Sequence, residues 1–123
     1  VLRYIVFAAL LLALSCEMSD DENHYKLVIF SYFGSFIGTY TLDSDVYIIR
    51  SADIVYDSGI YTYSKGLGSL TNLDVDIAGD PATTFLKVVL YQNNEKADST
   101  SASRTEAGAS VSINFSYAAP EVK

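Results

Sequence analysis

Apolar and polar residues alternate along most of the chain from Tyr25 onward, which is the period of a β-strand with one buried face. The alternation is strictest at residues 73–77 and 111–117, where aspartate, serine or asparagine fills every second position. Residues 85–91 are apolar throughout apart from Lys87, as is typical of a strand buried on both faces. After residue 16 no stretch shows a helical stripe, so the pattern predicts an all-β domain.

The same pattern predicts further strands, and residues that favour turns separate them. The strands are expected at residues 25–33, 36–42, 46–50, 54–56, 60–64 and about 97–104, and the turns at 34–35, 43–45, 57–59, 65–68, 79–81 and 92–95. Such closely spaced short strands indicate a single antiparallel β-sandwich of Ig-like or related topology. We expect this domain at residues 25–117, with a flexible tail at 118–123.

Residues 27–40 are apolar enough to be compared with a membrane span. Ser31, Gly34, Ser35 and Gly38 interrupt the segment, and it is short for a span. We therefore expect a buried hairpin at this position.

The N-terminus has a different composition from the rest of the chain. Arg3 precedes an unbroken apolar run at residues 4–14, which would cover about half of a ~30 Å hydrocarbon core. The run has the length of the apolar region of a secretory signal, and the small residue Ser15 precedes Cys16. Residues 19–23 are then polar and acidic, as expected of a solvated tether.

The stretch Leu12-Ala13-Leu14-Ser15-Cys16 resembles the lipobox of bacterial lipoproteins, although Ala13 and Leu14 depart from its strict form. The resemblance implies that residues 1–15 are a signal peptide and that Cys16 is lipidated (palmitate is one such acyl chain). Residues 16–24 would then form the lipid-bearing tether of a protein in the bacterial cell envelope. The acidic run at residues 20–22 also resembles surface-export signals of Bacteroidetes lipoproteins, or it is simply a solvated linker. An outer-membrane or cell-surface position is therefore one expectation.

The chain is acidic, with 15 acidic and 8 basic residues and a net charge of −7. The basic residues are scattered singly, whereas phosphate backbones require clustered Lys and Arg. We therefore expect no nucleic-acid partner and no adhesion to anionic lipid, so that lipid on Cys16 would be the route to the membrane.

Few residues offer catalytic or metal chemistry. His24 is the only histidine, and it stands beside the tether, where a general base would not be held against a nucleophile. Asp74, Asp76 and Asp80 are close in sequence but do not follow the calcium-loop pattern, since Ala78 and Phe85 occupy two ligand positions. We expect no catalytic residue, no metal and no cofactor.

The order of segments from Phe36 to Tyr117 is similar to that of the mycobacterial small membrane proteins of the MmpS type, and to small exported β-sandwich lipoproteins generally. The first resemblance implies an accessory subunit of an envelope exporter of lipids or small molecules. The chain lacks that family's paired cysteines and tryptophan motif.

Three tyrosines gather around one predicted turn. Tyr56, Tyr61 and Tyr63 are candidates for contact with a sugar or a protein if their rings are exposed together, and for ordinary packing if they are not. The leading hypothesis is a non-catalytic binding or accessory module of the envelope, with an exporter subunit and a carbohydrate-binding surface module as alternatives. A small hydrolase is disfavoured because no base is placed.

Overall fold

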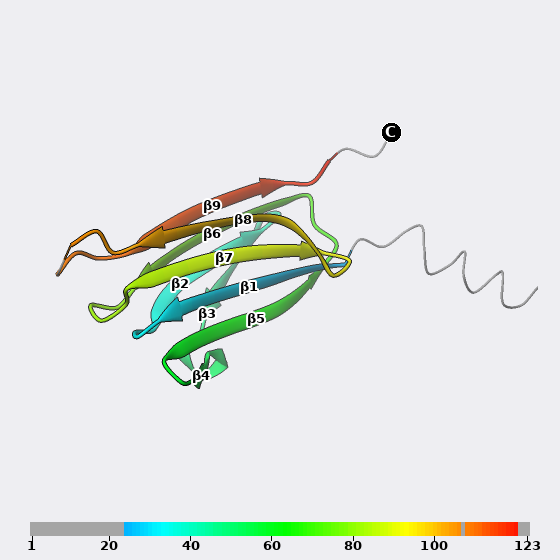
Figure 1. Ribbon diagram of the computed structural model, residues 1–123. Coiled ribbons are helices and arrows are strands. Elements are labelled where there is room, and N and C mark those ends of the chain that lie inside the picture. The colour runs from blue at the N-terminus through cyan, green and yellow to red at the C-terminus, as the bar shows by residue number, and fades with distance from the viewer. Residues whose placement is uncertain (1–23, 107, 121–123) are drawn as a thin grey trace, which may run out of the picture.

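The structure is a computed structural model that describes residues 24–106 and 108–120. Its strands form two antiparallel sheets packed face to face (Figure 1). The elements are β1 (Tyr25–Tyr32), β2 (Phe36–Leu42), β3 (Asp45–Ile49), the short 3-10 helix η1 (Ser51–Asp53), β4 (Val55–Asp57), β5 (Ile60–Gly68), β6 (Asn72–Gly79), β7 (Phe85–Gln92), β8 (Glu95–Ser103) and β9 (Ser112–Ala118). The prediction of an all-β antiparallel sandwich is therefore confirmed. Cys16, the expected signal peptide at 1–15 and most of the expected tether lie outside the described residues.

The strands are ordered β4-β5-β1-β7-β8 in the first sheet and β3-β2-β6-β9 in the second. The orders β4-β5-β1 and β3-β2-β6-β9 match the orders D-E-B and C′-C-F-G of immunoglobulin-type sandwiches. The place of strand A beside strand B is taken by β7, which belongs to the β7–β8 hairpin and comes late in the chain. In the chain, the β7–β8 hairpin stands between β6 and β9, which are neighbours in the second sheet, but the hairpin itself belongs to the first sheet.

The expected hairpin at residues 27–40 is wrong. β1 pairs with β5 and β7, whereas β2 pairs with β3 and β6, so the chain crosses from one sheet to the other at Phe33–Ser35. Both segments are apolar because each is a central strand of its own sheet, and central strands have at least one fully covered face. Ser31 stabilises the crossing, since its hydroxyl donates a 2.5 Å hydrogen bond to the carbonyl of Gly34.

The turn expected at residues 65–68 is also wrong. β5 continues through Gly68, and Gly66 and Gly68 lie opposite Lys26 and Tyr25 of β1. A register shift between Tyr25 and Lys26 accommodates the two glycines. Glycine tolerates such an irregularity in a strand as well as it tolerates a turn, so its presence alone did not distinguish the two.

The core lies between the sheets and consists of the inward residues of the alternating strands. Its fully buried side chains include Leu27, Ile29, Val75, Leu86 and Val88, each with 0 % of its surface exposed. Burial of an aliphatic side chain of this size stabilises the fold by about 1.5–3 kcal/mol. The strict alternation of β6 and β9 follows from their having one core face and one solvent face.

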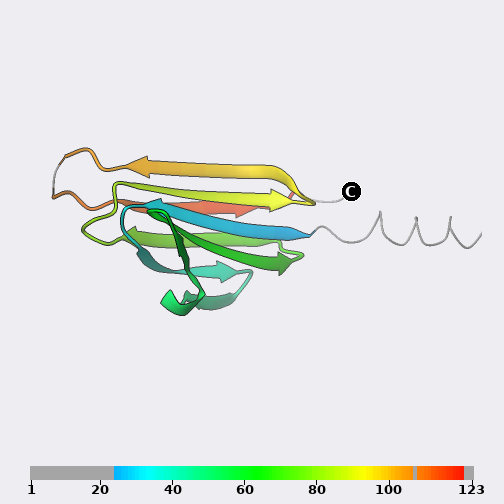
Figure 2. The ribbon, with the colours of Figure 1, turned by 60° about the horizontal axis from the view of Figure 1, so that its bottom comes forward.

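The described part of the chain begins and ends at the same end of the sandwich. β1 starts there and runs to the far end, where the Phe33 crossing and the β4–β5 turn lie (Figures 1 and 2). Eight residues of extended strand separate the two ends by about 23 Å. Any segment that precedes Tyr25 therefore joins the domain opposite the Phe33 end.

Candidate functional site

Four aromatic rings lie side by side on the solvent side of the first sheet, at its Phe33 end. Tyr32 of β1 lies directly opposite Phe85 of β7, with ring centroids 5.0 Å apart. Phe30 is 6.0 Å from Tyr32 and 6.2 Å from Phe85, and Phe33 is 6.5 Å from Tyr32. We call Phe30, Tyr32, Phe33 and Phe85 the aromatic cluster.

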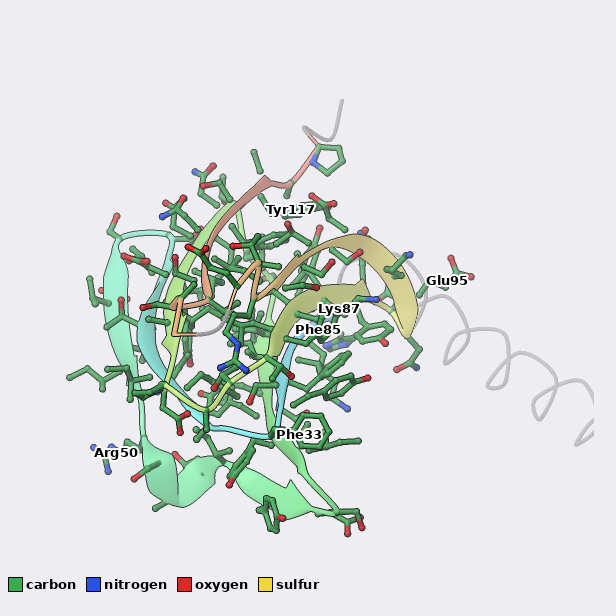
Figure 3. The ribbon with its side chains drawn as sticks, turned by 60° about the vertical axis from the view of Figure 1, so that its left-hand side comes forward. Phe33, Arg50, Phe85, Lys87, Glu95 and Tyr117 are labelled. Atoms are coloured by element: carbon green, nitrogen blue, oxygen red, sulfur yellow. The ribbon has the colours of Figure 1, made fainter. Side chains whose placement is uncertain are left out.

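The cluster faces solvent because these strands turn their other side chains to the core. Leu27, Ile29, Leu86 and Val88 point inward, so Phe30, Tyr32 and Phe85 share the outer face. Phe30 and Phe85 are half-buried against each other, whereas Phe33 is 70 % exposed. Figure 3 views the molecule from this end and places Phe33, Phe85 and Lys87 on one flank, with Arg50 on the opposite flank.

Phe33 occupies an unfavourable backbone conformation. Its φ is 67°, in the left-handed region, where a residue with a β-carbon is disfavoured by roughly 1–2 kcal/mol. The surrounding structure holds it there, because its N–H donates a 2.8 Å hydrogen bond to the carbonyl of Gly59 in the β4–β5 turn. Phe33 lies in the turn where the chain crosses between the sheets, and its ring, which is 70 % exposed, contributes little to the core.

Cations accompany the rings on this face. Lys87 lies opposite Phe30, and Lys26 lies opposite Tyr91 further along the same pair of strands. Lys96 extends the row onto β8, opposite Tyr91. None of the central strands β1, β5 and β7 contains an acidic residue, although the chain has 15. The outer face of these three strands therefore carries Lys26 and Lys87 and no carboxylate, whereas Asp57 of β4 stands in the same cross-strand row as Tyr32 and Phe85.

The three tyrosines singled out from the sequence are not exposed together. Tyr56 is 60 % exposed and lies 4.7 Å from Tyr61, which is half-buried. Tyr63 is only 5 % exposed and packs in the core. Burial, followed by a hydrogen bond to Tyr40, raises the pKa of Tyr63. The structure thus brings Tyr56 and Tyr61 together as a pair and directs Tyr63 away from solvent.

A groove lies on the opposite flank, along the free edge of β3. It has a volume of about 480 Å³, and its walls come from β2, β3, β5 and the segment around η1. Tyr47 stacks on Tyr40 at 5.1 Å with an angle of 19° between the ring planes, and Arg50, Asp53 and Lys65 supply charge. We call it the β3 groove.

Two of the three acidic residues considered for calcium, Asp74 and Asp80, hold local structure together. The carboxylate of Asp80 accepts hydrogen bonds from the N–H groups of Ser35 (2.9 Å) and Ala82 (2.8 Å), and that of Asp74 accepts one from the Ser116 hydroxyl (2.6 Å). Within residues 24–106 and 108–120, no three His, Cys, Asp or Glu side chains are placed to share a metal ion.

His24 lies directly before β1, where the described chain enters the domain. The N–H of His24 donates to the side-chain oxygen of Asn93 (2.9 Å), and its carbonyl accepts from the N–H of Asn93 (2.8 Å), which fastens the start of β1 to the β7–β8 turn.

Over the described residues, no helix has the length and apolar character needed to cross a bilayer.

No protein-family model, curated protein or solved structure matches the chain. The functional argument therefore depends on the surfaces described above.

Proposed function

We propose that the chain is a non-catalytic binding module of the bacterial cell envelope, and that the aromatic cluster with Lys87 beside it binds a glycan. The observation that carries the proposal is a run of four contiguous rings on the solvent side, two exposed and two half-buried, with the exposed Phe33 at a positive φ. Exposed apolar groups gathered in one patch mark binding surfaces more often than scattered ones do.

A sugar fits the chemistry of this face. The C–H groups on one side of a pyranose ring carry slight positive charge and pack on the negative face of an aromatic ring. Phe30, Tyr32 and Phe85 lie together on the outer side of the sheet, with their ring planes tilted by 31–41° to one another. Lys87 stands beside the rings, where its ammonium group can donate to hydroxyl or carboxylate oxygens.

Lys87 favours an acidic glycan over a neutral one, because it stands opposite Phe30 within the aromatic cluster. Its ammonium group would attract a uronate or phosphate group, whereas Lys26 and Lys96 lie further along the strands, beside Tyr91. Attraction between exposed charges weakens as salt rises. Binding to acidic glycans should therefore fall between low and high ionic strength.

The proposed anchor agrees with this placement. If lipid on Cys16 holds the chain to a membrane, the domain is attached at the Tyr25 end, and the aromatic cluster lies at the other end of β1. The rings would then be presented about 23 Å further from the membrane than the attachment point. Such an arrangement suits a module that contacts a glycan layer.

The test is a glycan microarray probed with the full chain in which Ser replaces Cys16, so that lipid does not interfere. We expect binding to one class of acidic glycan, and loss of that binding in Phe33→Ala and Phe85→Ala. Tyr56→Ala is the matched control, because Tyr56 is an equally prominent exposed ring away from the cluster. Binding lost in Tyr56→Ala and kept in Phe33→Ala would contradict the proposal, as would an array with no signal.

A further inference from the structure

The edge strand β3 lacks the protection found on the other three edge strands of the sandwich. β4 has only three residues, and β8 carries charged side chains and a register shift between Leu90 and Tyr91 of its neighbour. β9 runs beside β8 on the other flank, which leaves little of that edge open (Figure 1). β3 instead exposes Val46 (65 %), Tyr47 (43 %) and Ile48 (72 %). An apolar edge strand of this kind is a template for pairing with another strand.

The pairing of β3 with β2 determines which backbone groups are available. A two-residue turn joins Leu42 to Asp45, so this pair exchanges hydrogen bonds, and the pairs alternate from there. Asp45, Tyr47 and Ile49 therefore direct their N–H and C=O groups toward β2. Val46 and Ile48 direct theirs toward the open edge.

The β3 groove leaves space along this edge. Its walls include three consecutive β3 residues, Val46, Tyr47 and Ile48, which means that it follows the strand's backbone and not one of its faces. On the far side it is bounded by Tyr63 and Lys65 of β5. An added strand would meet free backbone groups and open space together.

We propose that β3 pairs antiparallel with β3 of a second copy of this chain, about a two-fold axis that passes through Tyr47. In this register Val46 of each copy lies opposite Ile48 of the other. Those are the two residues whose backbone groups point outward, so the pairing forms hydrogen bonds in both directions. The two four-stranded sheets become one continuous sheet.

The side chains are self-complementary in the same register. On the outer face Val46 of one copy meets Ile48 of the other, and both side chains are exposed in the single chain. On the inner face the two Tyr47 rings meet beside the Tyr40 rings on which they stack.

A second copy is the occupant that these observations favour, because one two-fold operation brings together both the outward backbone groups and the exposed apolar side chains of Val46 and Ile48. A strand from a different protein would need apolar side chains at the positions opposite Val46 and Ile48 to pair equally well. The association is independent of the aromatic cluster, which lies on the other flank of the molecule (Figure 3).

Disulfide cross-linking tests the register. Tyr47 would face its own copy in a pair that exchanges no hydrogen bonds, where the Cα atoms are about 4.5 Å apart, within the range of a disulfide. Tyr47→Cys in a Cys16→Ser background carries the only thiol of the chain. We expect mild oxidation to give a covalent dimer with this variant and not with Tyr56→Cys in the same background. Equal cross-linking of both variants, or of neither, overturns the proposed pairing.

Sedimentation of the Cys16→Ser chain tests the association itself. We expect a reversible dimer whose dissociation constant rises roughly tenfold or more with Ile48→Lys, because the substitution puts a charge at the proposed contact. Ile37→Lys is the matched control, since Ile37 is also 72 % exposed on the same outer face but lies one strand away from the edge. A chain that remains monomeric up to millimolar concentration overturns the proposal. So does a dimer that Ile48→Lys leaves intact.

Discussion

Tyr32 and Phe85 lie directly opposite each other on adjacent central strands, with ring centroids 5.0 Å apart on the solvent side of the sheet. Central strands usually keep large apolar groups on the core side, where each is worth about 1.5–3 kcal/mol of burial. Here β1 and β7 carry large apolar groups on the outer face as well, and at the Phe33 end these are exposed or half-buried. The outer face is therefore available to a ligand.

Phe33 should separate binding from stability. Phe33→Gly removes a ring that is 70 % exposed and relieves a φ of 67°, so we expect the free energy of unfolding to stay the same or to rise by up to about 1 kcal/mol. Binding to the glycan should fall at the same time. Denaturant unfolding and a binding isotherm on the same preparation check both halves. A loss of more than about 2 kcal/mol of stability would show that Phe33 is a structural residue.

Gly38 should be intolerant of any side chain. A β-carbon there would overlap the carbonyl oxygen of Asp76 and approach the Ile77 Cγ2 to 2.6 Å. We expect Gly38→Ala to lower the free energy of unfolding by about 1–3 kcal/mol through overpacking between β2 and β6. Gly66→Ala is the control, since a β-carbon at Gly66 meets nothing within 4 Å. Similar losses in both variants would mean that the effect is one of chain flexibility and not of close packing.

Stability should fall steeply at alkaline pH. Burial, with a further contribution from a hydrogen bond to Tyr117, raises the pKa of Tyr25 from 10.0 to about 12. The unfolded chain loses this proton near pH 10 and the folded chain only near pH 12, so the stabilising contribution is complete below pH 10 and is lost as the pH rises through that window. Tyr63 acts in the same direction, because its pKa is also raised.

Tyr25→Phe provides the check on that pH dependence. The variant loses a hydrogen bond, worth about 1 kcal/mol, at every pH below 10, and it also loses one titrating group. Its free energy of unfolding should therefore decline less between pH 10 and pH 12 than that of the parent chain. Parallel declines for the two proteins would rule out Tyr25 as a contributor.

Cys16 should carry lipid. We expect the intact mass of membrane-extracted protein to correspond to a chain that begins at Cys16 with acyl groups attached, and we expect Cys16→Ala to be released from the membrane without them. Several acyl chains hold a protein on a bilayer durably, because each buried CH₂ contributes about 0.8 kcal/mol. A native chain that begins before Cys16, or that has no added lipid mass, would remove the anchor from the proposal.

The period of two located most of the strands because most of them have one face in the core, although β4 is exposed throughout. Residues 73–77 and 111–117, which alternate most strictly, form the parts of β6 and β9 that have one solvent face. The alternation could not show that β1 and β2 belong to different sheets. Pairing depends on contacts between residues far apart in the chain, such as Tyr32 with Phe85.

The aromatic cluster was missed because β1 and β7 are apolar on both faces. Sequence alone gave no reason to direct Phe30 and Phe85 outward in preference to Ile29 and Leu86. For the tyrosine candidates the sequence does indicate a common orientation, because Tyr61 and Tyr63 are two residues apart in one strand and therefore share a strand face. That face is the inner one, which leaves Tyr63 buried.

The central claim is that a glycan binds on the aromatic cluster, and amide chemical-shift mapping tests it most directly. The chain in which Ser replaces Cys16 would be titrated with the acidic glycan that gives the strongest array signal. We predict that the shifts concentrate at residues 30–33 and 85–87 and vanish in Phe33→Ala. Shifts that concentrate instead at Tyr47, Arg50 and Lys65 in the β3 groove would contradict the account.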